Sequence, residues 1–534
     1  MNLILRTYPS ALATGINANW HKAYRAVFWF FVLMLLPVMV KAQDIKIQLN
    51  ENKITAAITE LEKKTVEKMQ QTGLPGLAIG IVYQDRVLYH KGFGVREAGK
   101  PEKVDADTVF QLASISKPLG STVIAGLVSD GVVAWDDLVS KYEPDFALHD
   151  VYATRHLTIG DLYSHRSGLP EHAGDILEDM GYDRAEVLHR LRFIPLQNLF
   201  RSQYAYTNFG LTAGAVAAAN AAQQNWEDLS ETRLYKPLGM KHTSSRYEDF
   251  INNPNHAAGH ILLNGKWVFR QQRQPDAQSP AGGASSSIND MVQWLRLHLA
   301  QGKLDGKQIV SAKALEETYV PPIDPVTKRP ASYAKGWNVG HDDTGLLKLS
   351  HSGAFSMGAA TTVFLLPQEK LGIIILTNTT PFGVPEALAL SFIDLVTHDK
   401  ADQNLFEQKF DYGKKQFEQM RLADISKTDY AKPPEKASPA LTLENYVGTY
   451  TNDFIGPIEI INQAGKLQMT QGPLKNHTYP LTHYDGNLFF YDTTGENEVG
   501  LSGVRFNVNA NGKAITLWVE NLDTYGMGSL LRKP

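Results

Sequence analysis

Two pairs of strand-like segments, far apart in the chain, constrain its fold most strongly. Residues 77–82 and 87–90 are apolar and flank a short polar turn. Residues 362–366 and 373–376 form a second apolar pair around another polar turn. Apolar runs separated by turn residues predict antiparallel hairpins. Because the chain between the pairs is mostly helical or loop-like, we expect an α+β domain whose antiparallel sheet is built from both ends of the sequence.

Apolar residues at helical spacing indicate helices around this sheet, at residues 54–71, 288–299 and 386–396. The pattern changes after about residue 400. Residues 402–429 are charged and compatible with a helix, and residues 432–439 are rich in proline. We interpret 43–400 as one domain and 401–440 as a charged, proline-rich linker.

The last segment, residues 441–534, reads as a small all-β module. Short strand-like runs follow one another closely, at 458–461, 466–469, 487–491, 504–508 and 515–519. Turn pairs such as Asp485-Gly486 and Asn511-Gly512 lie between them. This pattern predicts a C-terminal antiparallel β-barrel.

The first 42 residues resemble a secretory signal peptide. Basic residues, including Lys22 and Arg25, precede the apolar run 26–40, and the sequence Val40-Lys41-Ala42 follows. The run is shorter than the ~20 residues that comfortably span a bilayer. We therefore expect cleavage after Ala42, no stable membrane span afterwards, and a periplasmic or extracellular protein. An uncleaved N-terminal anchor is the alternative.

Composition excludes several classes of function. The 534 residues carry a formal net charge of -4, without the basic field typical of nucleic-acid binding proteins. The chain contains no cysteine, so disulfides and thiolate chemistry are excluded. No His-Glu-x-x-His zinc motif and no Gly-x-Ser-x-Gly elbow is present. We expect no metal and no cofactor, and a small molecule or short peptide as substrate.

A serine and a lysine three residues apart form the first candidate catalytic motif. Ser114 and Lys117 precede a helix-like run, and positions i and i+3 share a helix face. A lysine in a desolvated pocket has a lowered pKa, so its neutral amine can accept a hydroxyl proton and activate the serine for attack on an acyl carbon. Alone, the spacing is weak evidence, because it also arises by chance.

Two further motifs carry chemistry. Tyr206 and Asn208 precede an alanine-rich helix, and a phenol beside a lysine ammonium can ionise more easily and shuttle protons. The tripeptide Tyr206-Thr207-Asn208 recurs as Tyr450-Thr451-Asn452, which we interpret as a strand end. The segment from His351 through Gly353 to Ala354 follows a predicted strand. Glycine there lets a substrate backbone approach closely, and the next amide can face an oxyanion.

The order, spacing and surroundings of these motifs together resemble the serine β-lactamase and penicillin-recognising superfamily. The closest resemblance is to its class C-like, CubicO-type branch, which includes esterases and D-stereospecific peptidases. Further segments that resemble family signatures lie at 110–117, 156–162, 165–169, 281–283 and 289–291. The implied fold is a class C β-lactamase-like domain, an antiparallel sheet flanked by helices with a helical subdomain.

The resemblance implies a role for each residue. Ser114 would be the nucleophile, Lys117 its proton acceptor or electrostatic partner, and Tyr206 a base that also assists protonation of the leaving group. Which of Lys117 and Tyr206 takes the first proton stays open. Asn208 would bind the acyl amide of the substrate. The oxyanion hole would be the backbone N–H groups of Ser114 and Ala354.

His351 would line the substrate side beside Gly353, and it departs from the commonest pattern. Many penicillin-binding proteins and β-lactamases have lysine there, and a mostly neutral histidine offers a substrate carboxylate less fixed charge. We therefore expect an exported serine hydrolase of small esters, amides or D-amino-acid peptides. A class C-type β-lactamase or penicillin-binding protein and a non-turnover acyl-binding sensor are the alternatives. The acyl substrate and the oligomeric state stay open.

The C-terminal module resembles the lipocalin-like β domain sometimes attached to such hydrolases. The resemblance rests on residues 443–450 and on the strand pattern that follows. A barrel of this size can hold one small ligand or be filled by its own side chains. We expect a structural or substrate-gating role for it.

Overall fold

The computed structural model describes residues 49–534, apart from 324–331, 342–344, 399–401, 403 and 424. The predicted signal peptide, residues 1–42, lies outside these described residues. Within them, none of the helices combines the length and the apolar character that crossing a bilayer requires.

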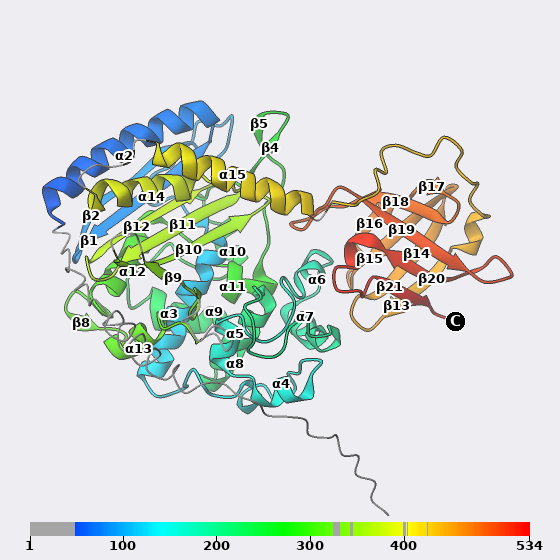
Figure 1. The fold of residues 1–534 in the computed structure, drawn as a ribbon, viewed down its shortest axis with the longest axis horizontal. Coiled ribbons are helices and arrows are strands. Elements are labelled where there is room, and N and C mark those ends of the chain that lie inside the picture. Colours follow the sequence, from blue (N-terminus) through cyan, green and yellow to red (C-terminus); the bar gives the residue numbers. More distant parts are fainter. Residues whose placement is uncertain (1–48, 324–331, 342–344, 399–401, 403, 424) are drawn as a thin grey trace, which may run out of the picture. The chain divides into compact units, whose positions relative to one another are not determined.

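A six-stranded antiparallel sheet forms the centre of the first domain (Figure 1). Its strand order is β2-β1-β12-β11-β10-β9, so a strand from the start of the domain pairs with one from its end. Leu77 of β1 is paired with Thr377 of β12. The predicted sheet built from both ends is therefore confirmed. The strands are β1 (Gly76–Tyr83), β2 (Arg86–Gly94), β9 (Asn338–His341), β10 (Leu347–Phe355), β11 (Ala359–Leu366) and β12 (Leu371–Thr377).

Helices cover both faces of this sheet, which explains why its central strands are mostly apolar. Every residue of β1, β11 and β12 is buried. Helix α12 (Ile288–Leu299) packs on one face, where its Val292 and Ile288 approach Gly80 of β1. Helices α2 (Glu51–Thr72) and α14 (Val384–Thr397) lie along the other face (Figure 1). Burial on both faces removes the alternation that marks a half-exposed strand.

The helical part of the domain is organised around two buried helices. Helix α3 (Ser116–Ser129) begins directly after the Ser114 segment, and α8 (Asn208–Ala221) begins with Asn208. Alanine and glycine along α8 permit close approach to its neighbours. The other helices are α4 (Val151–His156), α5 (Ile159–Tyr163), α6 (Asp175–Asp179), α7 (Arg184–Arg190), α9 (Trp226–Ser230), α10 (Tyr247–Ile251), α11 (Ser279–Gly282) and α13 (Ala312–Glu317).

The segment 156–162, which resembles a family signature, has a local structural explanation. Thr158 caps α5 through a reciprocal capping box with Asp161. The same Asp161 carboxylate binds Arg201 through two hydrogen bonds of 2.8 and 2.7 Å. One carboxylate thus starts a helix and fixes the loop that leads to Tyr206.

The charged segment after the sheet contains a helix, α15 (Leu405–Ala423), which contacts α14. Its Phe406 is buried, and the Lys68 ammonium of α2 lies 5.0 Å from the centre of that ring. Lys68 also forms an ion pair with Glu407. The predicted linker, 401–440, therefore includes a helix packed on the first domain.

The C-terminal module is a nearly closed antiparallel barrel of nine strands, in the order β16-β15-β14-β13-β21-β20-β19-β18-β17. Its interior is filled by its own side chains: Tyr450, Phe489 and Phe506 are buried and their rings contact one another. The strands are β13 (Gly448–Asn452), β14 (Gly456–Gln463), β15 (Lys466–Gln471), β16 (His477–Pro480), β17 (Thr482–Asp485), β18 (Leu488–Asp492), β19 (Leu501–Val508), β20 (Ala514–Val519) and β21 (Ser529–Arg532).

Candidate active site

Ser114 lies in a strained turn at the start of α3. It occupies a short 3₁₀ turn (Ala113–Ile115), and the preceding residue, Ala113, has a φ of 47°. A non-glycine residue in this left-handed region costs free energy and persists only where the surroundings fix it. Ser116 provides part of that fixation, because its hydroxyl donates to the Ala113 carbonyl (2.7 Å) and accepts the N–H of Ala284 (2.9 Å).

Lys117 is fully buried below Ser114, and its ammonium has three hydrogen-bond acceptors. Nζ lies 3.0 Å from Ser114 Oγ, 2.7 Å from Asn208 Oδ1 and 2.9 Å from the carbonyl of Ala281. Burial lowers the pKa of Lys117 to about 7, although the charge of Asp175 acts in the opposite direction. A large fraction of Lys117 is therefore a neutral amine at neutral pH.

Tyr206 completes the contacts of Ser114. Its hydroxyl donates to Ser114 Oγ at 2.7 Å, and its ring centre lies 4.5 Å from Lys117 Nζ. The sequence suggested that the ammonium would lower the pKa of this phenol. In the structure burial dominates and raises the pKa of Tyr206, so the phenol stays protonated.

Asn208 links this group to a carboxylate that the sequence analysis did not identify. While its Oδ1 accepts from Lys117, its Nδ2 donates to Asp175 Oδ2 at 2.7 Å. Asp175 is 6% exposed, and the same oxygen is 2.9 Å from Nδ1 of His172. The two hydrogen bonds fix which end of the Asn208 amide faces Lys117. Asp175 therefore orients Asn208, which contacts the candidate base Lys117.

His172 lies at the exposed edge of the site. Its side chain is half exposed, and its ring centre is 5.7 Å from that of Tyr206. Burial disfavours the imidazolium, but the hydrogen bond and charge of Asp175 outweigh this and raise the pKa of His172. The sequence carries one signal for this pair, because His172 and Asp175 are three residues apart.

The His351 segment lies on a strand. Strand β10 runs through Phe355, so His351 and Gly353 both belong to it. His351 is buried; its Nδ1 donates to the carbonyl of Ser352 at 2.8 Å, and its Nε2 accepts from the Tyr333 hydroxyl at 2.9 Å. Burial and the Lys117 charge lower the pKa of His351 to about 3. The ring is therefore neutral, with both nitrogens occupied.

Gly353 is required by the chain's own backbone. A Cβ atom there would lie 2.2 Å from the carbonyl oxygen of Leu112, 2.3 Å from Thr361 Oγ1 and 3.0 Å from the Ser114 nitrogen. The sequence suggested that Gly353 admits a substrate backbone. In the structure, the backbone that approaches Gly353 is that of the segment carrying Ser114. The next residue, Ala354, is exposed and follows directly on this contact.

We expect Gly353→Ala to displace the Ser114 segment and to destabilise the domain by about 1–3 kcal/mol, as overpacking does. Urea unfolding followed by tryptophan fluorescence measures the change. Gly340→Ala on the neighbouring strand β9 is the matched control, because nothing lies within 4 Å of the added Cβ. Equal stability of the two variants would contradict the proposed steric role of Gly353.

The antiparallel sheet flanked by helices, with a helical part beside it, is a β-lactamase-like fold. Residues 61–398 match the family model Beta-lactamase, and residues 432–526 match a Domain of unknown function (DUF3471). Because the first match covers more than half of the chain, the protein belongs to the β-lactamase family.

Similar proteins agree with this assignment. The chain is 25% identical over 488 residues to Unguisins hydrolase ungD of Aspergillus violaceofuscus, covering 82% of this chain and 83% of that protein. It is 24% identical over 453 residues to Beta-lactamase-like protein 2 of Dictyostelium discoideum, covering 83% and 79%. The octameric penicillin-binding protein homologue of Pyrococcus abyssi superposes with a TM-score of 0.55 at 20% identity, over 89% of this chain and 100% of that one. This last likeness shows the fold.

Proposed function

We propose that the protein is an exported serine hydrolase that acts through an acyl-enzyme on Ser114. The observation that carries the proposal is the position of Ser114 Oγ, within 3.0 Å of Lys117 Nζ and 2.7 Å of the Tyr206 hydroxyl. This places a base and a proton donor each in hydrogen-bond contact with the same nucleophile. The hydrolase name of one relative supports the reaction class, and the apolar leader sequence supports export.

Lys117 is the first proton acceptor in this proposal, because its pKa is near 7 whereas burial keeps Tyr206 a phenol. The Lys117 amine takes the hydroxyl proton as Ser114 Oγ attacks the carbonyl carbon. The oxyanion forms at the N–H groups of Ser114 and Ala354. As the tetrahedral intermediate collapses, Tyr206 donates a proton to the leaving group. The Lys117 ammonium then returns a proton to Tyr206. A water molecule then attacks the acyl carbon with the same proton transfers, which frees Ser114 and releases the acid.

The substrate class follows from the charge in the site. His351 is neutral and occupied on both nitrogens, so position 351 presents no fixed cation to the carboxylate of a β-lactam. Small esters, amides or D-amino-acid peptides therefore fit better than β-lactams. A β-lactamase or penicillin-binding activity and a non-turnover acyl-binding sensor are the competing functions.

Steady-state and burst kinetics on a substrate panel separate these functions. The panel contains p-nitrophenyl esters, D- and L-aminoacyl amides and the β-lactam nitrocefin. We expect turnover of an ester or a D-amide to exceed that of nitrocefin. Faster nitrocefin hydrolysis would favour a β-lactamase, and a single burst without a steady-state rate would indicate a sensor.

A further inference from the structure

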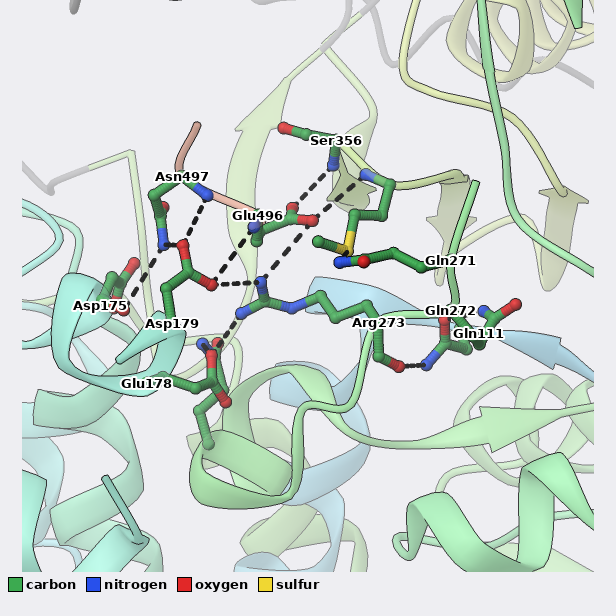
Figure 2. A network of polar contacts seen from close by, with 12 residues as sticks. Gln111, Asp175, Glu178, Asp179, Gln271, Gln272, Arg273, Ser356, Glu496 and Asn497 are labelled. Carbon is green, nitrogen blue, oxygen red and sulfur yellow. Dashed lines mark hydrogen bonds and ion pairs between the residues drawn. The ribbon is translucent and has the colours of Figure 1, made fainter. Parts of the chain in front are cut away.

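A buried arginine joins the C-terminal barrel to the catalytic domain beside the candidate site (Figure 2). Arg273 is 6% exposed and forms ion pairs with Glu178 and Asp179 of α6 and with Glu496 of the loop after β18. The neighbouring Asn497 also contacts α6. We call Glu178, Asp179, Arg273, Glu496 and Asn497 the carboxylate clasp.

On one side, the barrel loop surrounds the Asp179 carboxylate. Asp179 accepts the N–H of Glu496 at 3.2 Å, the N–H of Asn497 at 2.7 Å and the side-chain amide of Asn497 at 2.8 Å. Gly495 permits this approach: its φ is 115°, and a Cβ there would lie 2.9 Å from the Asp179 carboxylate. Successive backbone N–H groups around a carboxylate form an anion-binding concavity. The loop is therefore shaped to hold α6.

On the other side, the barrel loop holds the turn between β10 and β11. The Glu496 carboxylate accepts the N–H of Ser356 at 2.6 Å and that of Met357 at 3.2 Å. The Arg273 guanidinium lies 4.9 Å from the ring centre of Phe355, the last residue of β10. Glu496 thus anchors the end of the strand that carries Gly353 and Ala354.

The two anchored elements are the ones that flank Ser114. Helix α6 begins with Asp175, which orients Asn208 toward Lys117. Asn497 Nδ2 also donates to the Asp175 carbonyl at 3.4 Å, and Figure 2 draws this contact. On the opposite flank, β10 passes against the backbone of Ser114. The loop therefore contacts both supports of the site without reaching the reacting atoms.

We propose that Glu496 and Asn497 of the C-terminal barrel are positioning residues of the catalytic site. The catalytic groups take up their working arrangement only when the barrel loop forms the carboxylate clasp with α6 and Arg273. The proposal rests on the proposed function. It gives the barrel a role in catalysis through α6 and β10. A displacement of catalytic groups by about 1 Å lowers turnover strongly, so loss of these anchors reduces kcat more than it weakens substrate binding.

The test is a double-mutant cycle in the full-length chain with a p-nitrophenyl ester, combining Asn497→Ala with Asp175→Asn. We expect Asn497→Ala to lower kcat about tenfold, with KM changed less than about twofold. In the Asp175→Asn background, the further loss from Asn497→Ala should fall below about twofold, because both changes act on one contact chain. Circular dichroism and thermal melting verify that the variants are folded.

Glu498→Gln is the matched control. Glu498 lies in the same loop and pairs with Arg270, but it is more exposed, and among the described residues its side chain forms no hydrogen bond or ion pair with α6 or the β10–β11 turn. We expect its kcat to equal that of the wild type. Glu496→Gln, which keeps the side-chain size, is the second test variant and should also lower kcat. It decides the test if Asn497→Ala does not fold.

Two results would overturn the proposal: a wild-type kcat in both clasp variants, or an additive cycle, which indicates only a general loss of structure. Failure of the proposed function is detected separately. The rate of Ser114 labelling by a fluorophosphonate is measured for this purpose, because labelling is a single reaction that does not depend on turnover. If the wild type hydrolyses no ester, the function proposal fails, and the labelling rates of the clasp variants still decide the positioning role.

Discussion

Replacing Ser114 by alanine is expected to reduce ester hydrolysis at least about 10³-fold, to the background rate. The change removes the protein atom that the proposed mechanism uses as the nucleophile, while leaving Lys117 and Tyr206 in place. Hydrolysis is followed spectrophotometrically, and a fluorophosphonate adduct is located by mass spectrometry of peptides. The wild type should carry the adduct on Ser114, and the variant should carry none.

Ser121→Ala on α3 is the matched control for this experiment. Ser121 is one helical turn beyond Lys117, fully buried, and its hydroxyl has no hydrogen-bond partner among the described residues. Its removal should leave activity unchanged. Hydrolysis that survives in Ser114→Ala at the wild-type rate would remove Ser114 as the nucleophile.

Replacing Lys117 by methionine should lower kcat/KM by about 10²–10⁴, the usual contribution of a general base. In the wild type, the ammonium form cannot accept a proton, so kcat/KM should rise with pH and reach half of its maximum near pH 7, the pKa of Lys117. The residual activity of Lys117→Met should lack this rise. A pH–rate profile of both proteins measures the difference.

His172 is a second titratable group beside Tyr206, and the hydrogen bond and charge of Asp175 raise its pKa. His172→Gln is therefore the control for the pH profile. We expect this variant to keep the acid limb of the wild type. If the limb disappears in His172→Gln but persists in Lys117→Met, the histidine and not the lysine controls the proton transfer.

The main sheet was predictable because its strands carry strong local signals. Strands β11 and β12 are mostly apolar and are separated by a four-residue turn, and α12 shows helical spacing over its full length. Short barrel strands such as β16 and β21 were not identified. Each has four residues of mixed polarity, so their extended form depends on pairing with neighbours rather than on their own pattern.

The candidate site was predictable where motifs are contiguous and not where the fold brings separate segments together. Ser114 and Lys117 lie in one turn of chain, and Tyr206 and Asn208 in another. Asp175 could not be assigned to them, because its contact with Asn208 depends on the packing of α6 against α8. The burial of His351 and its bond to Tyr333 depend likewise on tertiary structure.

Synthesis of the chain delivers Ser114 well before the strands that surround it. Gly353 of β10 and Thr361 of β11, which contact the backbone beside Ser114, are translated much later, and β12 must then insert next to β1. Strand pairing between such distant segments slows folding. A partly made chain therefore holds Ser114 without the strands that fix its backbone, and this support is complete only once translation has passed the last strand of the sheet.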